Sequence, residues 1–262
     1  MSDDILPVLH DDGVVLAVHK PAGLLVHRTA LDPHETRTVM ELLRRQFDAR
    51  LHAIHRIDKG TSGVLLLARD AHAAARLGAA FMARETGKRY LAFVRGWPPE
   101  QARVEHALRP DDAPADAPAQ DAVTEFARGA CIEVANGVDR YARSRYALVE
   151  ARPLTGRRHQ IRRHLKHLSH PIIGDATHGK GPHNRWWAQR LGITRLWRHA
   201  LELDVPHPDG GRLRVASPLD AAWNADWQAL LREISADRPP GSPACRPQSA
   251  HGPDSWCGRN PA

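Results

Sequence analysis

One acidic residue in this 262-residue chain lies in a setting suited to chemistry. Asp58 follows His55, Arg56 and Ile57 in a loop rich in Gly, Ser and Thr, and a continuous apolar run begins after Gly63. A carboxylate placed just before a buried strand can be presented at the edge of a sheet, where it can act as a base or a nucleophile. An Asp in such a loop also often only shapes the backbone through an Asx-turn. The spacing alone leaves both interpretations open.

The densest positive charge lies between Arg140 and His167. This stretch holds one acidic residue, Glu150, and nine basic ones, which are Arg140, Arg143, Arg145, Arg152, Arg157, Arg158, Arg162, Arg163 and Lys166. Neutralisation of phosphates by such residues gives strong, salt-sensitive binding to RNA, although a solvated surface is the simpler interpretation. Arg162 and Arg163 are adjacent on a segment with helical character, so they cannot both point outward. At least one of them is therefore expected to point inward toward a buried anion.

An aromatic residue is interleaved with basic ones in the predicted strand 88–96. Tyr90 and Ala92 share one face of this strand, and Leu91 and Phe93 share the other. A tyrosine among basic residues can stack on a nucleobase. A core tyrosine explains the same pattern equally well.

Four histidines crowd one segment and suggest a different kind of site. His164 and His167 are three residues apart, with His159 and His170 close by, and such spacing can bind zinc. No Cys or carboxylate lies among them, and the neighbouring Arg and Lys side chains would repel a dication. We therefore expect no metal site here.

The overall composition indicates an anionic partner. The formal net charge is +7 and the sequence pI is near 9.8, which favours nucleic acid or an acidic membrane surface, unless it reflects an Arg-rich proteome background. No apolar stretch of 18 residues occurs, so no segment is predicted to span a membrane. The acidic N-terminus and the three scattered cysteines, which form no disulfide framework, point to the cytoplasm.

The elements that must position these residues follow from hydrophobic spacing. Helical patterns cover residues 38–50, 70–84, 157–168 and 221–234, and strand patterns cover 5–9, 14–19, 63–69, 88–96, 143–152, 199–205 and 212–216. Strands outnumber helices, and turns or single helices join most of them. We therefore predict an α+β fold with a mixed, mainly antiparallel sheet and flanking helices, forming one catalytic domain over residues 1–236.

Three other segments carry separate predictions. Residues 110–121 are rich in Pro, Ala and Asp and are expected to form a surface loop. The last helix is expected to pack through its large apolar side chains, which are Trp223, Trp227, Leu230 and Leu231. Residues 237–262 are rich in Pro, Gly, Ser and Arg, and a disordered tail is predicted there.

Taken together, these segments resemble the RluA-type family of pseudouridine synthases. Four motifs occur in that family's order, namely Val18 to Leu24 (VHKPAGL), His55 to Gly63 (HRIDKGTSG), Lys88 to Gly96 (KRYLAFVRG) and Thr155 to Arg162 (TGRRHQIR). The block His170 to Asp175 completes the match, which covers roughly residues 5–220. Ile57 replaces the Leu that is more usual before the Asp, a swap that conserves volume.

The resemblance implies a function for each motif. It makes Asp58 the catalytic carboxylate, Arg162 its ion-pair partner and Tyr90 the residue that contacts the target base. Arg56 would fill the space that a flipped base leaves. The other motif residues expected to contact the substrate are His55, Thr61, Arg157, His159 and Gln160. The reaction detaches uracil from ribose and rejoins it through carbon; it requires no cofactor and no metal. Asp58 could attack the ring, attack the sugar or take a proton from the ribose.

Within the family, the segment 170–185 is most similar to the TruC-type branch, which modifies uridine 65 of tRNA. The sequence His178 to Arg185 (HGKGPHNR) carries this narrower resemblance, and Val26-His27-Arg28 is typical of the same branch. The basic segment 178–185, with Trp186 and Trp187 after it, is our candidate for an element that recognises the substrate, unless it is a packed surface loop with core tryptophans. Ribosomal RNA is the alternative substrate, and a non-catalytic RNA-binding protein of the same fold is the alternative class. Protein partners are not predicted.

Overall fold

The computed structural model describes residues 5–29, 34–35, 37–110, 113–114 and 116–236. Its centre is a ten-stranded sheet in which the path β1-β2-β4-β9-β5-β8-β7-β6 is extended by β10 on β9 and by β3 on β4. The strands are β1 Val8–Asp11, β2 Val15–Lys20, β3 His52–Ala53, β4 Ser62–Ala68, β5 Gly87–Arg95, β6 Gln101–Glu105, β7 Val123–Ala135, β8 Arg143–Pro153, β9 Arg198–Pro206 and β10 Arg212–Ala216. The ladder between β4 and β9 is parallel, whereas the other named ladders are antiparallel. The predicted mixed α+β fold is therefore confirmed.

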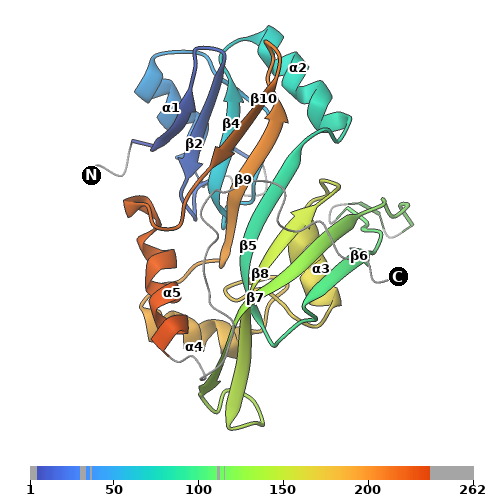
Figure 1. Ribbon diagram of the computed structural model, residues 1–262, viewed down its shortest axis with the longest axis vertical. Coiled ribbons are helices and arrows are strands. Elements are labelled where there is room, and N and C mark those ends of the chain that lie inside the picture. Colours follow the sequence, from blue (N-terminus) through green and yellow to red (C-terminus); the bar gives the residue numbers. More distant parts are fainter. Residues whose placement is uncertain (1–4, 30–33, 36, 111–112, 115, 237–262) are drawn as a thin grey trace, which may run out of the picture.

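The helices flank this sheet at both ends of the molecule (Figure 1). They are α1 Val39–Phe47, α2 Ala71–Met82, α3 Gln160–His167, α4 Gly181–Leu191, the short 3-10 helix η1 Ala222–Asn224 and α5 Ala225–Ala236. Helices α1 and α2 lie at one end with β2, β4 and β10, and α3 and α4 lie toward the other end with β6, β7 and β8 (Figure 1). Strand β5 runs lengthwise between the two groups, so it joins the two ends of the fold.

Side-chain caps fix where the first two helices begin. Thr38 accepts a hydrogen bond from the backbone N–H of Glu41, and the Glu41 carboxylate accepts one from the N–H of Thr38, which makes a capping box at α1. Asp70 caps α2 by accepting from the N–H of Ala73. The caps therefore define where α1 and α2 begin, and α2 packs against β4 and β9.

Gly63 allows β9 to approach β4 closely. Its φ is +113°, and a Cβ atom built on it would lie 2.1 Å from the carbonyl oxygen of Ala200, so any other residue would clash with the backbone. Ser62 and Gly63 thereby pair in parallel with His199 and Ala200. The start of β9 is consequently placed beside the loop that precedes β4.

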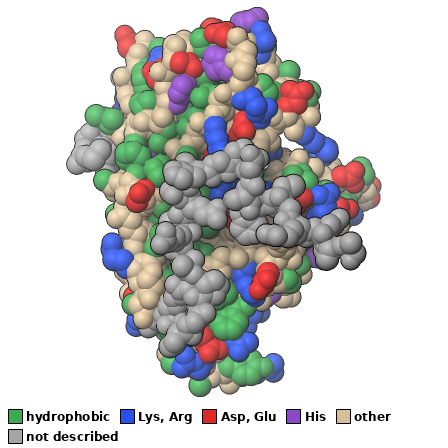
Figure 2. All heavy atoms as spheres, in the orientation of Figure 1, with side chains coloured by type: hydrophobic (Ala, Val, Ile, Leu, Met, Phe, Trp, Pro, Cys, Tyr) green, Lys and Arg blue, Asp and Glu red, His purple; other side chains and the backbone are tan. Residues whose placement is uncertain are grey.

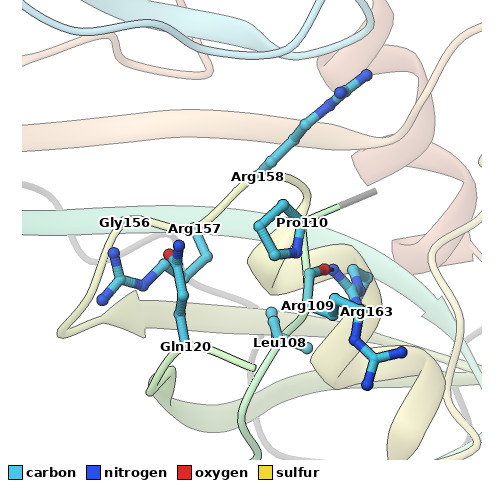
Figure 3. A pocket seen from close by; sticks show the side chains of 8 residues that line it. All are labelled: Leu108, Arg109, Pro110, Gln120, Gly156, Arg157, Arg158 and Arg163. Carbon is cyan, nitrogen blue, oxygen red and sulfur yellow. Dashed lines mark hydrogen bonds between the residues drawn. The ribbon is translucent and has the colours of Figure 1, made fainter. Parts of the chain in front are cut away.

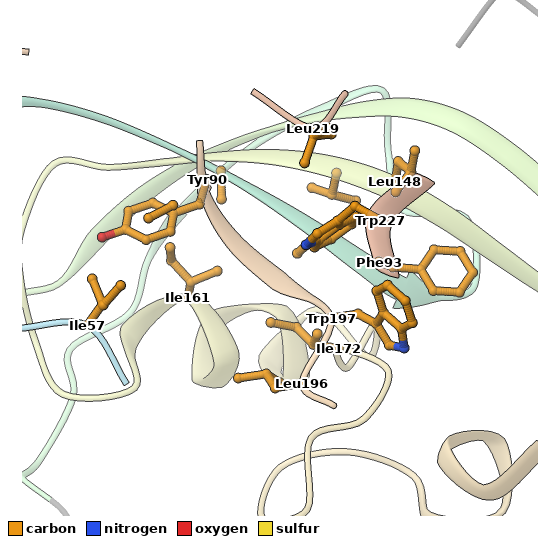
Figure 4. Packing of buried hydrophobic residues seen from close by; sticks show 14 of the residues in the cluster. Ile57, Tyr90, Phe93, Leu148, Ile161, Ile172, Leu196, Trp197, Leu219 and Trp227 are labelled. Carbon is orange, nitrogen blue, oxygen red and sulfur yellow. The ribbon is translucent and has the colours of Figure 1, made fainter. Parts of the chain in front are cut away.

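The hydrophobic core extends under the centre of the sheet. Figure 4 shows Phe93, Trp197 and Trp227 packed together, with Tyr90 and Ile57 at one end of the same cluster. Trp197 and Trp227 meet edge to face at 5.3 Å between ring centroids, a geometry that aromatic pairs favour. The core therefore continues up to the residue that precedes Asp58.

Several elements differ from the sequence-based prediction. The first hairpin is present, but β1 begins at Val8. Strands β6 and β7 were not predicted, and residues 181–185 of the segment 178–185, which was expected to be a loop, form the start of α4. Trp223 is 39% exposed, so the expected packing of the last helix through this residue is wrong, although Trp227 is fully buried. The tail predicted at 237–262 lies outside the described residues.

Candidate active site

The loop that carries Asp58 is fixed by its backbone. The carbonyl of Asp58 accepts a hydrogen bond from the N–H of Thr61 at 3.0 Å, which closes a tight turn. The carbonyl of Lys59 accepts from Gly23 N–H at 2.8 Å and from the Lys20 ammonium at 3.1 Å. The segment 20–23 therefore holds the Asp58 loop in place from the end of β2.

Lys20 is a buried cation directed at this loop. Its side chain is fully buried, and its Nζ donates to the carbonyls of Pro21, Leu24 and Lys59 at 2.7, 2.7 and 3.1 Å. Burial lowers the pKa of Lys20 to about 7, while the charge of Asp58 acts in the opposite direction. The ammonium thus fixes the backbone and contributes positive potential near Asp58.

Two arginines converge on one oxygen of Asp58. Nη1 of Arg162 lies 3.3 Å from Oδ2 of Asp58, and Nη2 of Arg198 lies 3.1 Å from the same Oδ2. Both guanidinium groups are almost enclosed, with 9% and 6% of their side chains exposed. The carboxylate is therefore placed at the junction of α3, β9 and its own loop.

These charges keep Asp58 ionised. Burial on its own would raise the pKa of the carboxyl, but Arg198, His159 and Arg162 together hold the pKa below its ordinary value. A partly buried carboxylate with such partners remains charged at neutral pH. An ionised oxygen in this position can act as a nucleophile or as a base.

Arg162 is itself anchored from behind. Its Nε and Nη2 donate to Oδ2 and Oδ1 of Asp175 at 2.7 and 2.8 Å, a bidentate pair in which the Asp175 side chain is fully buried. Asp175 also accepts from the backbone N–H groups of Thr177 and His178. The predicted pairing of Arg162 with Asp58 is present, but the shorter contacts of Arg162 are those with Asp175.

Tyr90 lies next to this group on β5. Cζ of Arg198 stands 5.5 Å from the centroid of the Tyr90 ring, within the range of a cation–π contact. Burial raises the pKa of the Tyr90 hydroxyl, Arg198 opposes this rise and Asp58 adds to it, so the phenol stays protonated at neutral pH. The hydroxyl points away from Phe93, Trp197 and Trp227 (Figure 4).

Comparison with protein families shows which family has this sequence. Residues 14–167 match the family model described as RNA pseudouridylate synthase. The chain belongs to this family. It is 42% identical over 244 residues to the protein named tRNA pseudouridine synthase C from Vibrio vulnificus, a match that covers 88% of this chain and 100% of that protein. It is 40% identical over 237 residues to the protein of the same name from Yersinia pestis, with 88% and 91% covered.

Solved structures agree with this assignment. The human protein titled RNA Pseudouridylate Synthase Domain Containing 4 has a TM-score of 0.62 and 26% identity, over 86% of this chain and 93% of that one. Human RNA Pseudouridylate Synthase Domain Containing 1 has a TM-score of 0.68, with 90% and 97% covered; at 24% identity it shows the shared fold. The chain is accordingly a synthase of the isomerase class.

Among the described helices none is long and apolar enough to cross a bilayer.

The other expected site residues of the Asp58 loop fall into two groups. Arg56 is exposed and forms no ion pair with another residue in the described part of the chain. His55 packs its ring on Phe81 at 5.2 Å, and its Nε2 accepts from the N–H of Leu66 at 3.0 Å. Burial lowers the pKa of His55 to about 4. Arg56 is thus exposed to solvent, whereas His55 makes contacts within the protein and Thr61 is buried.

The residues expected at the start of α3 are similarly divided. Gln160 is buried, and its amide binds Thr155, the N–H of Arg157 and two acceptors on β7. These bonds use its amide groups to join α3 to the sheet, so its role here is structural. His159 has a left-handed backbone (φ 54°), and its charge acts on Asp58. Arg157 lies at the surface and donates to the carbonyl of Asp121.

The histidines considered for zinc have other partners. His164 hydrogen bonds to Thr124 Oγ1, and His170 to the carbonyl of Arg95, while the His167 ring stacks on another histidine. No group of three or more ligand-type side chains suited to a metal occurs within the described ranges. The arrangement gives the zinc alternative no support.

The basic stretch is divided between two places in the structure. Arg143 and Arg145 lie on β8 at the end of the long β7–β8 hairpin, where both pair with Glu133, whereas Arg157 and Arg163 lie at α3. On the described part of the face in Figure 2, Lys and Arg side chains occur in separate places among acidic ones. The basic residues of this stretch therefore lie in at least two separate places.

Three residues of the site were not predicted to act there. Lys20 lies in the first motif and Asp175 in the last block, so the motifs contained a signal for both. Arg198 lies directly before the predicted strand 199–205, where nothing in the spacing distinguishes it. Its contact with Asp58 depends on the parallel pairing of β9 with β4.

Proposed function

We propose that this synthase converts a uridine of tRNA to pseudouridine, with Asp58 as the reacting group. The observation that carries the proposal is the ionised, partly buried carboxylate of Asp58, held by Arg162 and Arg198 beside Tyr90. The names of the relatives support tRNA as the substrate class. The resemblance of residues 178–185 to the branch specific for uridine 65 favours that position.

The reaction can proceed with the groups present. The bond between C1′ of ribose and N1 of uracil breaks, a bond between C1′ and C5 forms, and the hydrogen on C5 leaves while N1 gains a proton. No electrons are exchanged with another molecule. An ionised Asp58 supplies the nucleophile or base that these steps require. A protein that only binds RNA has no need for such a carboxylate.

The target base must leave its stack to reach Asp58. Flipping a base costs a few kcal/mol, which contacts in the pocket and a side chain that fills the gap offset. Arg56 suits this role because it is exposed two residues before Asp58 and its guanidinium is planar and cationic. We therefore propose that Arg56 fills the space that the flipped base leaves. His55, Thr61 and Gln160 are not among the substrate contacts that we propose.

Replacement of Tyr90 by Phe separates the two roles of this residue. The ring stays in place, so stacking on uracil, worth about 1–3 kcal/mol per base, is kept. The hydroxyl is protonated, and we expect it to assist proton transfer, so Tyr90→Phe should lower kcat by about 100-fold or more. Single-turnover kinetics with saturating enzyme measure this. A rate within twofold of wild type would leave only stacking for Tyr90.

The RNA backbone is expected to pass over a hollow beside α3 (Figure 3). The hollow has a volume of about 180 Å³, and it is lined by Leu108, Arg109, Pro110, Gln120, Gly156, Arg157, Arg158 and Arg163. The arginine side chains point in different directions from its rim (Figure 3), which suits several phosphates along a strand better than one enclosed anion. We propose that Arg157 and Arg158 contact phosphates there.

The double variant Arg157→Gln/Arg158→Gln tests these phosphate contacts. It should weaken tRNA binding at low salt, and the slope of log K against log salt should fall by about 1.8, roughly 0.9 for each phosphate that is no longer neutralised. Filter binding at several salt concentrations measures the slope. Arg212→Gln is the control, because Arg212 is exposed on β10 at the other end of the molecule (Figure 1). Equal slopes for the double variant and wild type would contradict the proposed role of Arg157 and Arg158.

Mapping of pseudouridine in a deletion strain tests the substrate. We expect one tRNA position, uridine 65, to lose pseudouridine, and the plasmid-borne gene to restore it. Loss of a ribosomal RNA position with unchanged tRNA would support the alternative substrate. The cytoplasmic location stays a prediction from the composition.

A further inference from the structure

Arg198 touches both of the groups that we place next to the uracil. Its Nη2 forms the ion pair with Oδ2 of Asp58 at 3.1 Å, and its Cζ lies 5.5 Å from the ring centroid of Tyr90. The residue is the first of β9, which Gly63 allows to lie directly beside β4. One guanidinium group therefore fixes the distance between the carboxylate and the aromatic ring.

Both arginines of the site select the same oxygen of Asp58. Arg162 donates a hydrogen bond to Oδ2, and the closest approach of Arg198 is also to Oδ2. No hydrogen bond from the described residues reaches Oδ1 of Asp58. Since a carboxylate oxygen engaged by two cations is a weaker nucleophile and base than a free one, Oδ1 is the oxygen better suited to react.

The two arginines differ in how their charge is used. Arg162 is shared between Asp58 and Asp175, and its shortest contacts are with Asp175. Arg198 has Asp58 as its one carboxylate partner in the described part of the chain. The charge of Arg198 therefore acts mainly on Asp58, and its removal should change Asp58 more than it changes the rest of the core.

We propose that Arg198 is a positioning residue of this synthase: it anchors Oδ2 of Asp58, aligns the carboxylate with the ring of Tyr90, and leaves Oδ1 as the oxygen that reacts with the nucleoside. The proposal rests on the proposed function for the identity of the substrate. Among the described residues, five charged or titratable groups surround Asp58, and each element packed around it contributes at least one. They are Lys20 of β2, Tyr90 of β5, His159 and Arg162 at α3, and Arg198 of β9.

Arg198→Met tests the proposal, because Met is similar in length and removes the charge and the ion pair with Asp58. A carboxylate displaced by about 1 Å can cost about 100-fold in rate, so kcat should fall about 10- to 100-fold while KM for tRNA changes less than about threefold. Arg198 helps to hold the pKa of Asp58 low, so its loss should shift the acid limb of the pH profile of kcat to higher pH. In Arg198→Lys the acid limb should return part of the way toward its wild-type pH, because the positive charge is restored. The recovery of kcat should be smaller, since an ammonium lacks the planar, forked geometry of a guanidinium.

Arg195→Met is the matched control. Arg195 is equally enclosed, at 6% side-chain exposure, but it pairs with Asp226 and does not contact Asp58. Its loss should lower the melting temperature and leave the acid limb in place. If Arg198→Met keeps kcat within twofold and an unchanged acid limb, or if Arg195→Met moves the limb equally, the positioning role is wrong.

A second readout separates this inference from the proposed function. Carbon-13 NMR of the Asp58 carboxyl follows its pKa without any turnover, and the pKa should be higher in Arg198→Met than in wild type. An unchanged pKa overturns the positioning role even when the wild-type enzyme is active. A raised pKa in a protein that modifies no RNA would support Arg198 and reject the proposed function.

Discussion

Asp58→Asn is expected to abolish turnover and to leave tRNA binding nearly unchanged. Asn has the shape of Asp but cannot ionise, so it offers neither a nucleophilic oxygen nor a base. The phosphate contacts proposed for Arg157 and Arg158 lie outside the Asp58 loop and remain. Turnover should fall below about one per cent of wild type, which corresponds to about 2.7 kcal/mol or more in activation free energy, while the dissociation constant for tRNA should change by less than about threefold.

The control for this variant is Asp204→Asn. Asp204 pairs with Arg212 on the ladder of β9 with β10. It lies on β9 six residues after Arg198, away from Asp58, so its loss should leave both rate and binding unchanged. Circular dichroism and thermal melting must show that Asp58→Asn is folded, because Arg198 loses its carboxylate partner in this variant. Residual turnover of a few per cent in a folded Asp58→Asn protein would exclude the nucleophilic role of Asp58.

Arg162→Ala should weaken both the fold and the reaction. Arg162 is the shared partner of Asp58 and of the fully buried Asp175, and removal of one member of a buried ion pair typically costs about 3–5 kcal/mol. We therefore expect the free energy of unfolding to fall by that amount, and kcat to fall with it because Asp58 loses one of its two anchors. Urea titration measures the first effect, and single-turnover kinetics at a temperature where the variant is folded measures the second.

The pH dependence of this stability loss has a defined sign. Burial on its own would raise the pKa of Asp175, but the hydrogen bonds from Arg162 and from the backbone hold it below the ordinary carboxyl value. A lowered folded-state pKa stabilises the protein above the unfolded-state pKa of about 3.9, and this contribution is lost as pH falls through the folded-state value. The difference in stability between wild type and Arg162→Ala should therefore shrink in acid.

An exposed arginine provides the comparison for Arg162. Arg212 is 52% exposed and pairs with Asp204, and exposed pairs of this kind contribute about 0–1 kcal/mol. Arg212→Ala should accordingly have almost no effect on stability or rate. Full stability and full activity of Arg162→Ala would mean that its two carboxylate contacts carry no energy.

The sequence predicted the parts of the site that depend on local order. The position of Asp58 just before a buried strand follows from the apolar run that becomes β4. The inward direction of one of the adjacent residues Arg162 and Arg163 follows from their position on a helix, and the family motif indicated that it is Arg162. Both features depend on residues that are neighbours in the sequence, so they can be predicted from one amino-acid sequence. The family motifs added Tyr90 and Arg56, whose roles depend on the substrate.

The parts that were missed depend on long-range pairing. Arg198 reaches Asp58 only because β9 pairs in parallel with β4 across more than a hundred residues, and no local pattern encodes such a ladder. Asp175 was expected only as a motif residue, yet it is the principal partner of Arg162. Residues 181–191 form a helix because Trp187 is buried against Phe93 and Tyr146, which the Gly, Lys and Pro residues at its start concealed.

The most direct test of Asp58 as the reacting group is the release of tritium from C5 of uridine in tRNA. Purified wild-type protein is incubated with tRNA transcripts that carry tritium at C5 of uridine, without added metal, and the label that appears in water is counted. We predict release of one tritium per tRNA molecule, and none when the target uridine is replaced by cytidine or when Asp58→Asn is the enzyme. Release that persists in Asp58→Asn, or no release from any tRNA by the folded wild-type protein, would contradict this role.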